Sequence, residues 1–438
     1  MKKTKFMTLL SMAMVAVLLI GCDTAKYDPN KPSENKELTP EESKQKLANV
    51  ANEFVNTFNP EDQREAVDAV NEVTTKFTSF NTDAILEYFG DDAQALTQLP
   101  RYAAEVAQGR RVATDVEPFV ISLEKYSVIF EADEATQTWV NKGKAPDNSI
   151  ILRVTTKEGK KIETKLWGKG KNSSYDFNEE DVNVTVILPK NVYFTLVLDQ
   201  TELIRVELEQ DVKLSDHFIV SVLANVANLS WTADVKLTLS SASLASSFKY
   251  GQETIYSIGV NVPKCKLIGK EDNQTYEDWL MQYGRRYEEL IQQIGSADAV
   301  VNVLGEVQAK VKFKNVGKFY TDLKDFAESH QMESKEDYDA FCKLINEAQE
   351  NGIYYNNNIK QAELRWQTYA REYETGSVYY PEAVIYFPAD GTTYSIEEYF
   401  SGQPFTDMLE SFYALVNKYA EYFGEILGGG NEPVVAED

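Results

Sequence analysis

The sequence predicts an α+β fold in which helical N-terminal and C-terminal layers pack on a central, long-stranded antiparallel sheet. Two observations lead to this prediction: apolar residues recur at helical spacing towards both ends of the chain, and at a spacing of two from residue 119 to residue 270. The clearest strand is Leu229–Ser240, in which every odd position is apolar and every even position is polar. Such alternation is typical of an antiparallel strand with one buried and one solvated face. We therefore expect the odd side chains, including Trp231, to be buried in a curved or half-barrel-like sheet.

The composition limits the function. The chain has 438 residues, of which 43% are hydrophobic, so it can bury a large core. Its formal net charge of −25 repels phosphate backbones, which argues against nucleic acid as a partner. With 3 cysteines and 2 histidines, the chain has too few ligands for a cysteine-rich or a histidine-based metal site. We expect neither a metal nor another cofactor.

The first 22 residues carry the strongest local signal. Three lysines, at positions 2, 3 and 5, precede the apolar run Met7–Ile20, which is too short for a permanent membrane span. The run ends in Leu19-Ile20-Gly21-Cys22, which resembles the lipobox of bacterial lipoproteins. That resemblance implies a signal peptide over residues 1–21, cleavage after Gly21 and a membrane anchor through lipid on Cys22. An ordinary signal peptide followed by a chance cysteine is the alternative.

Residues 22–38 are polar and contain 2 prolines, so we expect a flexible tether. The style of this N-terminal region resembles lipoproteins of the Bacteroidetes cell envelope, which implies an outer-membrane location. In that group a short acidic run after the cysteine favours export to the cell surface. Here only Asp23 and Asp28 follow Cys22 closely, so the periplasmic and the surface-exposed face both remain open.

Residues 39–118 are expected to be helical. Thr39, Pro40 and Glu42 form a helix start with a capping box. Two apolar stripes at helical spacing follow, and Asn59-Pro60 separates them. The first stripe comprises Leu47, Val50, Ala51, Phe54, Val55 and Phe58, and the second Ala66, Val70, Val73, Phe77 and Phe80.

Residues 119–270 are expected to form the sheet, because short alternating runs are separated there by turn residues. Successive long strands of this kind indicate an antiparallel meander. The predicted strands are Tyr126–Glu131, Thr136–Asn141, Ser149–Thr156, Lys161–Trp167, Val182–Leu188, Tyr193–Leu198, Leu203–Leu208, His217–Leu223, Leu229–Ser240 and Ile255–Val262.

Residues 271–427 are expected to return to helices, apart from a small hairpin around Asp390-Gly391. An apolar stripe from Phe405 to Ile426 predicts the last helix, and residues 428–438 are expected to be disordered. The other predicted helices are Tyr276–Ile294, Ala297–Ala309, Lys318–Ser329, Lys335–Glu350 and Ala362–Tyr373.

The sequence contains no phosphate-binding loop, nucleophile elbow or zinc-protease motif, and we predict that the protein is not an enzyme. Asp216 and His217 are adjacent, but neighbouring side chains of a strand point to opposite faces. We therefore expect them to share no site, unless the strand begins after Asp216. Cys265 and Cys342 can form a disulfide outside the cytoplasm, although two separately buried thiols are the expected outcome.

Aromatic residues are concentrated in the last third of the chain, where residues 353–424 hold 18 of the 51. One interpretation is a ring platform for a glycan or another flat ligand, with Tyr379, Tyr380, Tyr386 and Tyr399 as ligand-binding residues. The other is that one ring of each adjacent pair packs in the core while its neighbour is half-exposed.

Two functions agree with these features. The first is a non-catalytic, lipid-anchored binding or carrier protein of the cell envelope, whose sheet and helices enclose a groove for an apolar ligand. The second is an accessory surface lipoprotein that contacts a glycan or a protein partner through the aromatic-rich C-terminal region. Binding requires only shape, apolar area and a few polar groups, which the chain has.

Overall fold

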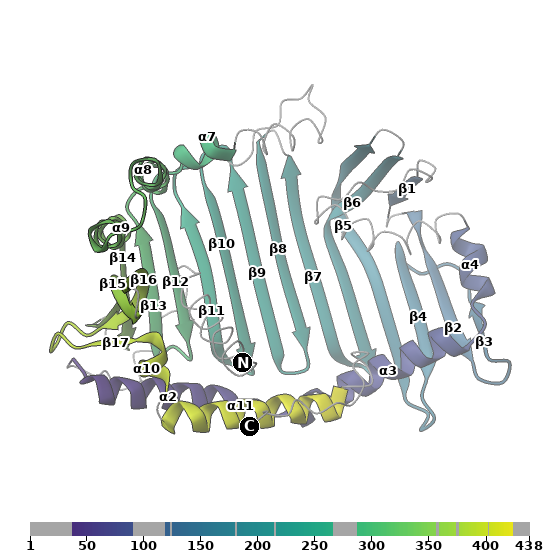
Figure 1. Ribbon diagram of the computed structural model, residues 1–438. Helices are drawn as coiled ribbons and strands as arrows, with labels where there is room; N and C mark the ends of the chain where they lie inside the picture. The colour runs from purple at the N-terminus through teal and green to yellow at the C-terminus, as the bar shows by residue number, and fades with distance from the viewer. Residues whose placement is uncertain are drawn as a thin grey trace. The chain divides into compact units, whose positions relative to one another are not determined.

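The computed structural model divides into two units, each built on antiparallel strands (Figure 1). The first unit comprises Met1–Pro60, Ala233–Leu267 and Arg286–Asp438, and the second comprises Glu61–Thr232 and Ile268–Arg285. The structure describes residues 37–90, 119–122, 125–179, 182–213, 216–265, 287–355, 359–373, 376–401 and 403–423. The predicted signal peptide, Cys22, nearly all of the predicted tether and the C-terminal tail lie outside these residues.

The sheet of the second unit runs from β2 to β8. Its strands are β2 (Val128–Asp133), β3 (Thr138–Asn141), β4 (Ser149–Thr155), β5 (Lys161–Glu179), β6 (Val182–Leu198), β7 (Thr201–Lys213) and β8 (His217–Val226). From β4 to β8 each strand pairs antiparallel with the next. However, β2 pairs parallel with β4, and β1 (Phe119–Ser122) pairs parallel with β6. The alternation in this region predicted an antiparallel sheet, and the sheet is mostly antiparallel; the two parallel pairings were not predicted.

Helices α3 (Arg64–Ser79) and α4 (Asp83–Phe89) pack on part of this sheet. The core between these helices and the sheet contains Ala66, Ala69, Ile85, Val128, Phe130, Trp139, Leu196 and Leu198. Trp139 is only 2% exposed, and its indole N–H donates to the Lys76 carbonyl at 3.4 Å. The apolar ring of Trp139 is therefore buried, and its one polar group has a hydrogen-bond partner.

The first unit extends from β9 to β17, and its boundary with the second unit falls inside β9 (Leu229–Thr238). β9 pairs with β10, and from β10 onwards each strand pairs antiparallel with the next. The strands are β10 (Ala242–Tyr250), β11 (Glu253–Val262), β12 (Ala297–Val303), β13 (Val307–Phe313), β14 (Gln349–Tyr355), β15 (Ile359–Tyr373), β16 (Gly376–Tyr386) and β17 (Thr393–Ser395). The helices are α2 (Pro40–Thr57), α7 (Tyr287–Gln292), α8 (Val316–Ser329), α9 (Lys335–Ala348), α10 (Ile396–Phe400) and α11 (Gln403–Phe423).

The start of α2 is fixed by local and long-range hydrogen bonds. The predicted capping box forms between Thr39 and Glu42. The buried Ser43 hydroxyl hydrogen-bonds with the hydroxyl groups of Tyr355 and Tyr399, at 2.7 and 3.1 Å. These contacts join α2 to β14 and α10, so residues far apart in the chain meet in one core.

The prediction that residues 271–427 are helical apart from a small hairpin is wrong, because β12, β13, β14, β15 and the first part of β16 are strands. The predicted helix Ala297–Ala309 is the hairpin of β12 and β13, with positive φ at Leu304 (51°) and Gly305 (65°), which an α-helix cannot contain. The predicted helix Ala362–Tyr373 lies in β15, because its residues pair with β16 along their length. In contrast, α8, α9, α11 and the β16–β17 hairpin lie where they were predicted.

The strand at Leu229–Thr238 is confirmed, but the burial of its odd side chains is not. Trp231 is 38% exposed, Leu239 is 45% exposed, and no residue of β8 or β9 is fully buried. In the second unit, the core cluster that contains residues of α3 and α4 takes its buried strand residues from β2 to β7 instead. The alternation thus predicted the strand correctly, whereas burial depends on where the covering helices lie.

We expect truncation of the two tryptophans to have very different effects. Trp139→Ala should lower the free energy of unfolding by about 3–5 kcal/mol, as large truncations in a core do. Trp231→Ala should cost less than about 1.5 kcal/mol, because much of that ring is in water already. Urea denaturation followed by circular dichroism measures both. Equal losses in the two variants would contradict this assignment of the core.

Candidate functional site

Among the described residues, a cluster of exposed aromatic side chains lies on the hairpin of β15 and β16. Tyr369 pairs directly with Tyr380, Arg371 with Val378, and Gln367 with Glu382. Because side chains alternate along a strand, these residues and Tyr373 share one side of the hairpin. We call this surface the hairpin face; it comprises Gln367, Tyr369, Arg371, Tyr373, Val378, Tyr380 and Glu382.

Helix α9 packs on β15 and β16, and it holds the hairpin in place (Figure 1). The side-chain oxygen of Asn346 in α9 accepts from the Trp366 N–H at 2.8 Å, and its amide nitrogen donates to the Trp366 carbonyl at 2.7 Å. Asn351 of β14 forms the same two bonds with the backbone of Leu364, at 2.7 and 2.9 Å. Each asparagine thus imitates a neighbouring strand and satisfies backbone groups that would otherwise lack partners.

Four large apolar or aromatic side chains of the hairpin face are open to solvent. Val378 is 54% exposed, Tyr373 50%, Tyr369 44% and Tyr380 37%. The ring centroids of Tyr369 and Tyr380 are 5.1 Å apart, and their planes are inclined by 44°. Scattered exposed apolar residues are common, but a contiguous group of this kind is typical of an interaction surface.

Charged groups border these rings. The guanidinium group of Arg371 lies 5.5 Å from the ring centroid of Tyr373, and it forms no ion pair with any residue that the structure describes. Arg365 lies 3.3 Å above the ring of Tyr386 and is paired with Glu363. Burial and the neighbouring Glu398 raise the pKa of Glu382. The face therefore combines tyrosine rings with an unpaired guanidinium group and one carboxyl group.

The structure does not bring the four predicted tyrosines together. Tyr380 and Tyr386 lie on the side of the hairpin that carries the hairpin face, whereas Tyr379 lies on the opposite side. Tyr399 of α10 is 1% exposed and packs in the core of the first unit. The interpretation that one ring of each adjacent pair faces inwards therefore applies to Tyr399.

The sequence reading missed Tyr369, Arg371, Tyr373 and Val378. Residues 362–373 were interpreted as a helix, in which Trp366, Tyr369 and Tyr373 share a stripe. In the strand, Trp366 lies on the other side from both tyrosines. The available signal was the alternation of Tyr369, Arg371 and Tyr373 with shorter side chains, together with the preference of aromatic residues for strands.

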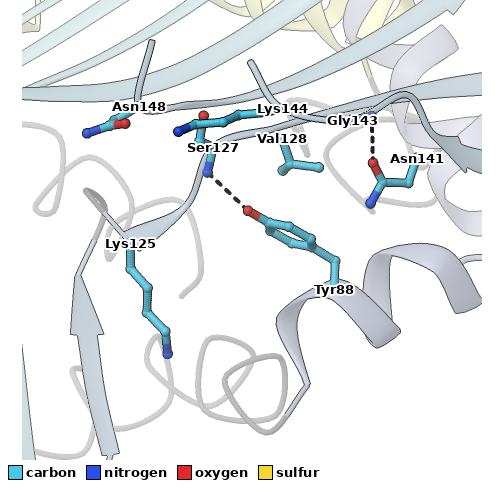
Figure 2. A pocket seen from close by; sticks show the side chains of 8 residues that line it. All are labelled: Tyr88, Lys125, Ser127, Val128, Asn141, Gly143, Lys144 and Asn148. Carbon is cyan, nitrogen blue, oxygen red and sulfur yellow. Dashed lines mark hydrogen bonds between the residues drawn. The ribbon is translucent and has the colours of Figure 1, made fainter. Parts of the chain in front are cut away.

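The structure contains a hollow in each unit, and each is lined by residues of that unit alone. In the first unit, an apolar hollow of about 50 Å³ lies beside Leu364, Ile385 and Phe400. In the second unit, a polar hollow of about 400 Å³ is lined by Tyr88, Lys125, Ser127, Asn141, Lys144 and Asn148 (Figure 2). The apolar hollow is far below the range of about 300–1,000 Å³ that is usual for small-molecule sites.

For Asp216 and His217 the alternative holds: the strand begins after Asp216, and the two side chains meet in one cluster. Asp216 lies in the turn before β8, so its carboxylate reaches the Nδ1 atom of His217 at 3.1 Å. The Nε2 atom of His217 lies 2.9 Å from the Asp211 carboxylate. Hydrogen bonds to Asp211 and Asp216 raise the pKa of His217. The arrangement is an ion-paired cluster at a turn.

Other reactive groups are separate from the hairpin face. Cys265 and Cys342 are both buried and form no disulfide with each other, in agreement with the expected separate burial. Among the described residues, no group of histidine, cysteine and acidic side chains is placed to hold a metal ion. No helix in the described part of the chain is long and apolar enough to cross a membrane.

Comparison with known proteins gives no assignment. No protein-family model matches the chain, and neither a curated protein nor a solved structure matches it significantly. Any functional statement therefore depends on the residues and their geometry.

The buried Tyr399 predicts a dependence of stability on alkaline pH. Burial raises its pKa to about 12, from an ordinary value of 10.0. Between these two pH values the unfolded chain releases the Tyr399 proton and the folded chain retains it. The contribution of Tyr399 to the free energy of unfolding is therefore fully present below pH 10 and is lost as the pH rises towards 12. In Tyr399→Phe, the free energy of unfolding should fall by about 2–3 kcal/mol less than in the wild type over this pH range. Urea denaturation at several alkaline pH values measures the slope, and an unchanged slope would contradict the assignment.

Proposed function

We propose that this protein is a lipid-anchored, non-catalytic binding protein of the cell envelope, and that its hairpin face contacts a protein partner. The observation that carries the proposal is the solvent-exposed pair Tyr369–Tyr380, bordered by Tyr373, Val378 and Arg371. Aromatic residues and arginine are enriched at protein interfaces, whereas lysine is depleted. The hairpin face contains tyrosines and an arginine but no lysine.

Two details favour a protein over a glycan. The most exposed of the large apolar residues on the face is Val378, an aliphatic residue that cannot stack on a sugar ring. The rings of Tyr369 and Tyr380 are inclined by 44° and so do not form a flat platform. A protein partner can pack between inclined rings and offer a carboxylate to Arg371. A glycan remains the alternative, since Gln367 and Glu382 provide polar groups beside the rings.

The carrier function has weaker support. Its groove for an apolar ligand requires a volume of several hundred Å³, whereas the apolar hollow of the first unit measures about 50 Å³. The observation in its favour is β8, where Phe218, Val220 and Val222 alternate on one face without being fully buried. A lipid or another apolar ligand on that face is therefore the second candidate.

The lipid anchor and the envelope location rest on the resemblance of Leu19-Ile20-Gly21-Cys22 to a lipobox. In a bacterial envelope such an anchor keeps a protein at the membrane and leaves its domains free to contact partners. An outer-membrane location, on either the periplasmic or the surface face, is part of the same proposal.

Metabolic labelling with a fatty-acid probe tests the anchor. The wild-type chain should incorporate the probe, because the thiol of Cys22 is the acceptor of the diacylglyceryl group. Cys22→Ser should lose the label and leave the membrane fraction, whereas Cys342→Ser, which changes a buried thiol, should keep both properties. Equal labelling of wild type and Cys22→Ser would rule out lipidation at this residue.

Site-specific photo-crosslinking in intact cells tests the hairpin face. A photoreactive residue at Tyr380 should give a discrete protein adduct, whereas one at the exposed Glu328 of α8 should not. Arg371→Glu should reduce the Tyr380 adduct about tenfold, because a charge reversal at an interface costs at least about 1.4 kcal/mol.

The same experiment separates the alternatives. Equal adducts at Tyr380 and Glu328 would reject the hairpin face as a specific surface. Binding to a glycan array that is lost in Tyr369→Ala would favour the glycan. Lipid that co-purifies with the protein, identified by mass spectrometry, would favour the carrier.

A further inference from the structure

The polar hollow of the second unit differs in chemistry from the hairpin face. Its volume of about 400 Å³ lies within the usual range for small-molecule sites, which is about 300–1,000 Å³. Tyr88 of α4 lies on one side of it, and Asn141, Lys144 and Asn148 come from the end of β3 and the loop that follows (Figure 2). Three separate segments of the chain therefore supply polar groups to one space, since Lys125 and Ser127 precede β2.

Hydrogen bonds within the site orient its groups as donors. The side-chain oxygen of Asn141 accepts from the Gly143 N–H at 2.8 Å, so the amide nitrogen of Asn141 remains available to donate. The hydroxyl oxygen of Tyr88 accepts from the Ser127 N–H at 3.0 Å, and no described residue accepts the Tyr88 proton (Figure 2). Each of these two side chains uses its acceptor inside the fold and retains a donor.

Lys144 contributes positive charge to the hollow, although the chain as a whole carries −25. Lys125 and Lys144 line it, and none of the described residues that line it carries a carboxylate. The neighbouring Asp147 is engaged by Lys165 at 2.7 Å, and this hydrogen bond is the main reason why its pKa is lowered. Within the described part of the chain, Lys144 and Asn148 form no ion pair or side-chain hydrogen bond.

We propose that this hollow binds a small oxyanion ligand, whose phosphate, sulfate or carboxylate group accepts hydrogen bonds from Lys144, Asn141 and Asn148. Several donors and the ammonium group of Lys144, with no carboxylate among the described lining residues, disfavour a cation. They also leave the hydroxyl donors of a neutral ligand with few acceptors. An oxyanion accepts hydrogen bonds from several donors at once and neutralises the charge of Lys144. The inference is independent of the partner that contacts the hairpin face.

Isothermal titration calorimetry on the full chain tests the proposal with glucose 6-phosphate, glucuronate, inorganic phosphate and glucose. At least one of the three anions should bind with a Kd of about 1 mM or tighter, and glucose should not. Binding should weaken as the ionic strength rises, because the attraction is electrostatic. Tighter binding of glucose 6-phosphate than of inorganic phosphate would identify a sugar-borne anion, and equal binding would identify the free anion.

Two lysines in one loop provide a matched pair of variants. Lys144→Gln should weaken anion binding about tenfold, because it removes a charged donor from the hollow. Lys142→Gln should leave binding unchanged, because Lys142 lies outside the hollow and is paired with Glu131 at 3.9 Å. Tyr88→Phe, which keeps the ring and removes the hydroxyl donor, should weaken binding about threefold or more. No binding by any of the anions, equal binding of glucose, or equal losses in the two lysine variants would overturn the proposal.

Discussion

Backbone hydrogen bonding between neighbouring antiparallel strands is the interaction on which both units depend. It satisfies the polar groups of long strands such as β5, β6 and β15, and it sets the register in which their side chains meet. Register has functional consequences because side chains alternate with a period of two. A slip of one residue between β15 and β16 would break the pairing of Tyr369 with Tyr380 and with it the exposed ring pair.

Polar contacts in the core of the first unit link helices to specific strands. The buried Gln361 of β15 accepts a hydrogen bond from the Leu38 backbone at 2.7 Å, next to the start of α2. Ser43 joins α2 to Tyr355 and Tyr399, and Asn346 joins α9 to the backbone of β15. A buried polar group without a partner would be costly, so each contact favours one docking position of its helix.

The two candidate sites use different cationic residues, and this difference is informative. Arg371 of the hairpin face stands beside a tyrosine ring, where a planar, weakly hydrated guanidinium group can be desolvated against a partner. The polar hollow contains lysines, whose compact ammonium groups suit an anion that stays partly hydrated. The first arrangement fits contact with another macromolecule, and the second fits a small ligand.

The sequence by itself determined where regular structure forms when the local signal is strong. Alternation over Leu229–Ser240 predicted the strand that forms at Leu229–Thr238. The capping box predicted the start of α2, and helical spacing predicted α8, α9 and α11. The sequence was ambiguous where the apolar residues fit both the helical period and the strand period, as in residues 362–373. In that segment, pairing with β16 produced a strand.

Only the tertiary structure decided which side chains are covered. Trp231 and Tyr369 have patterns that occur equally in buried and in exposed strands, and their exposure depends on where helices from distant parts of the chain pack. The same limit applied to the sites. Lys144, Tyr88 and Asn148 have no common motif, because their proximity comes from the folding of α4, β2 and the loop after β3 around one hollow. The spacing of apolar and polar residues along the chain does not depend on such long-range contacts. The sequence therefore predicted many of the helices and strands but not the surfaces that they form.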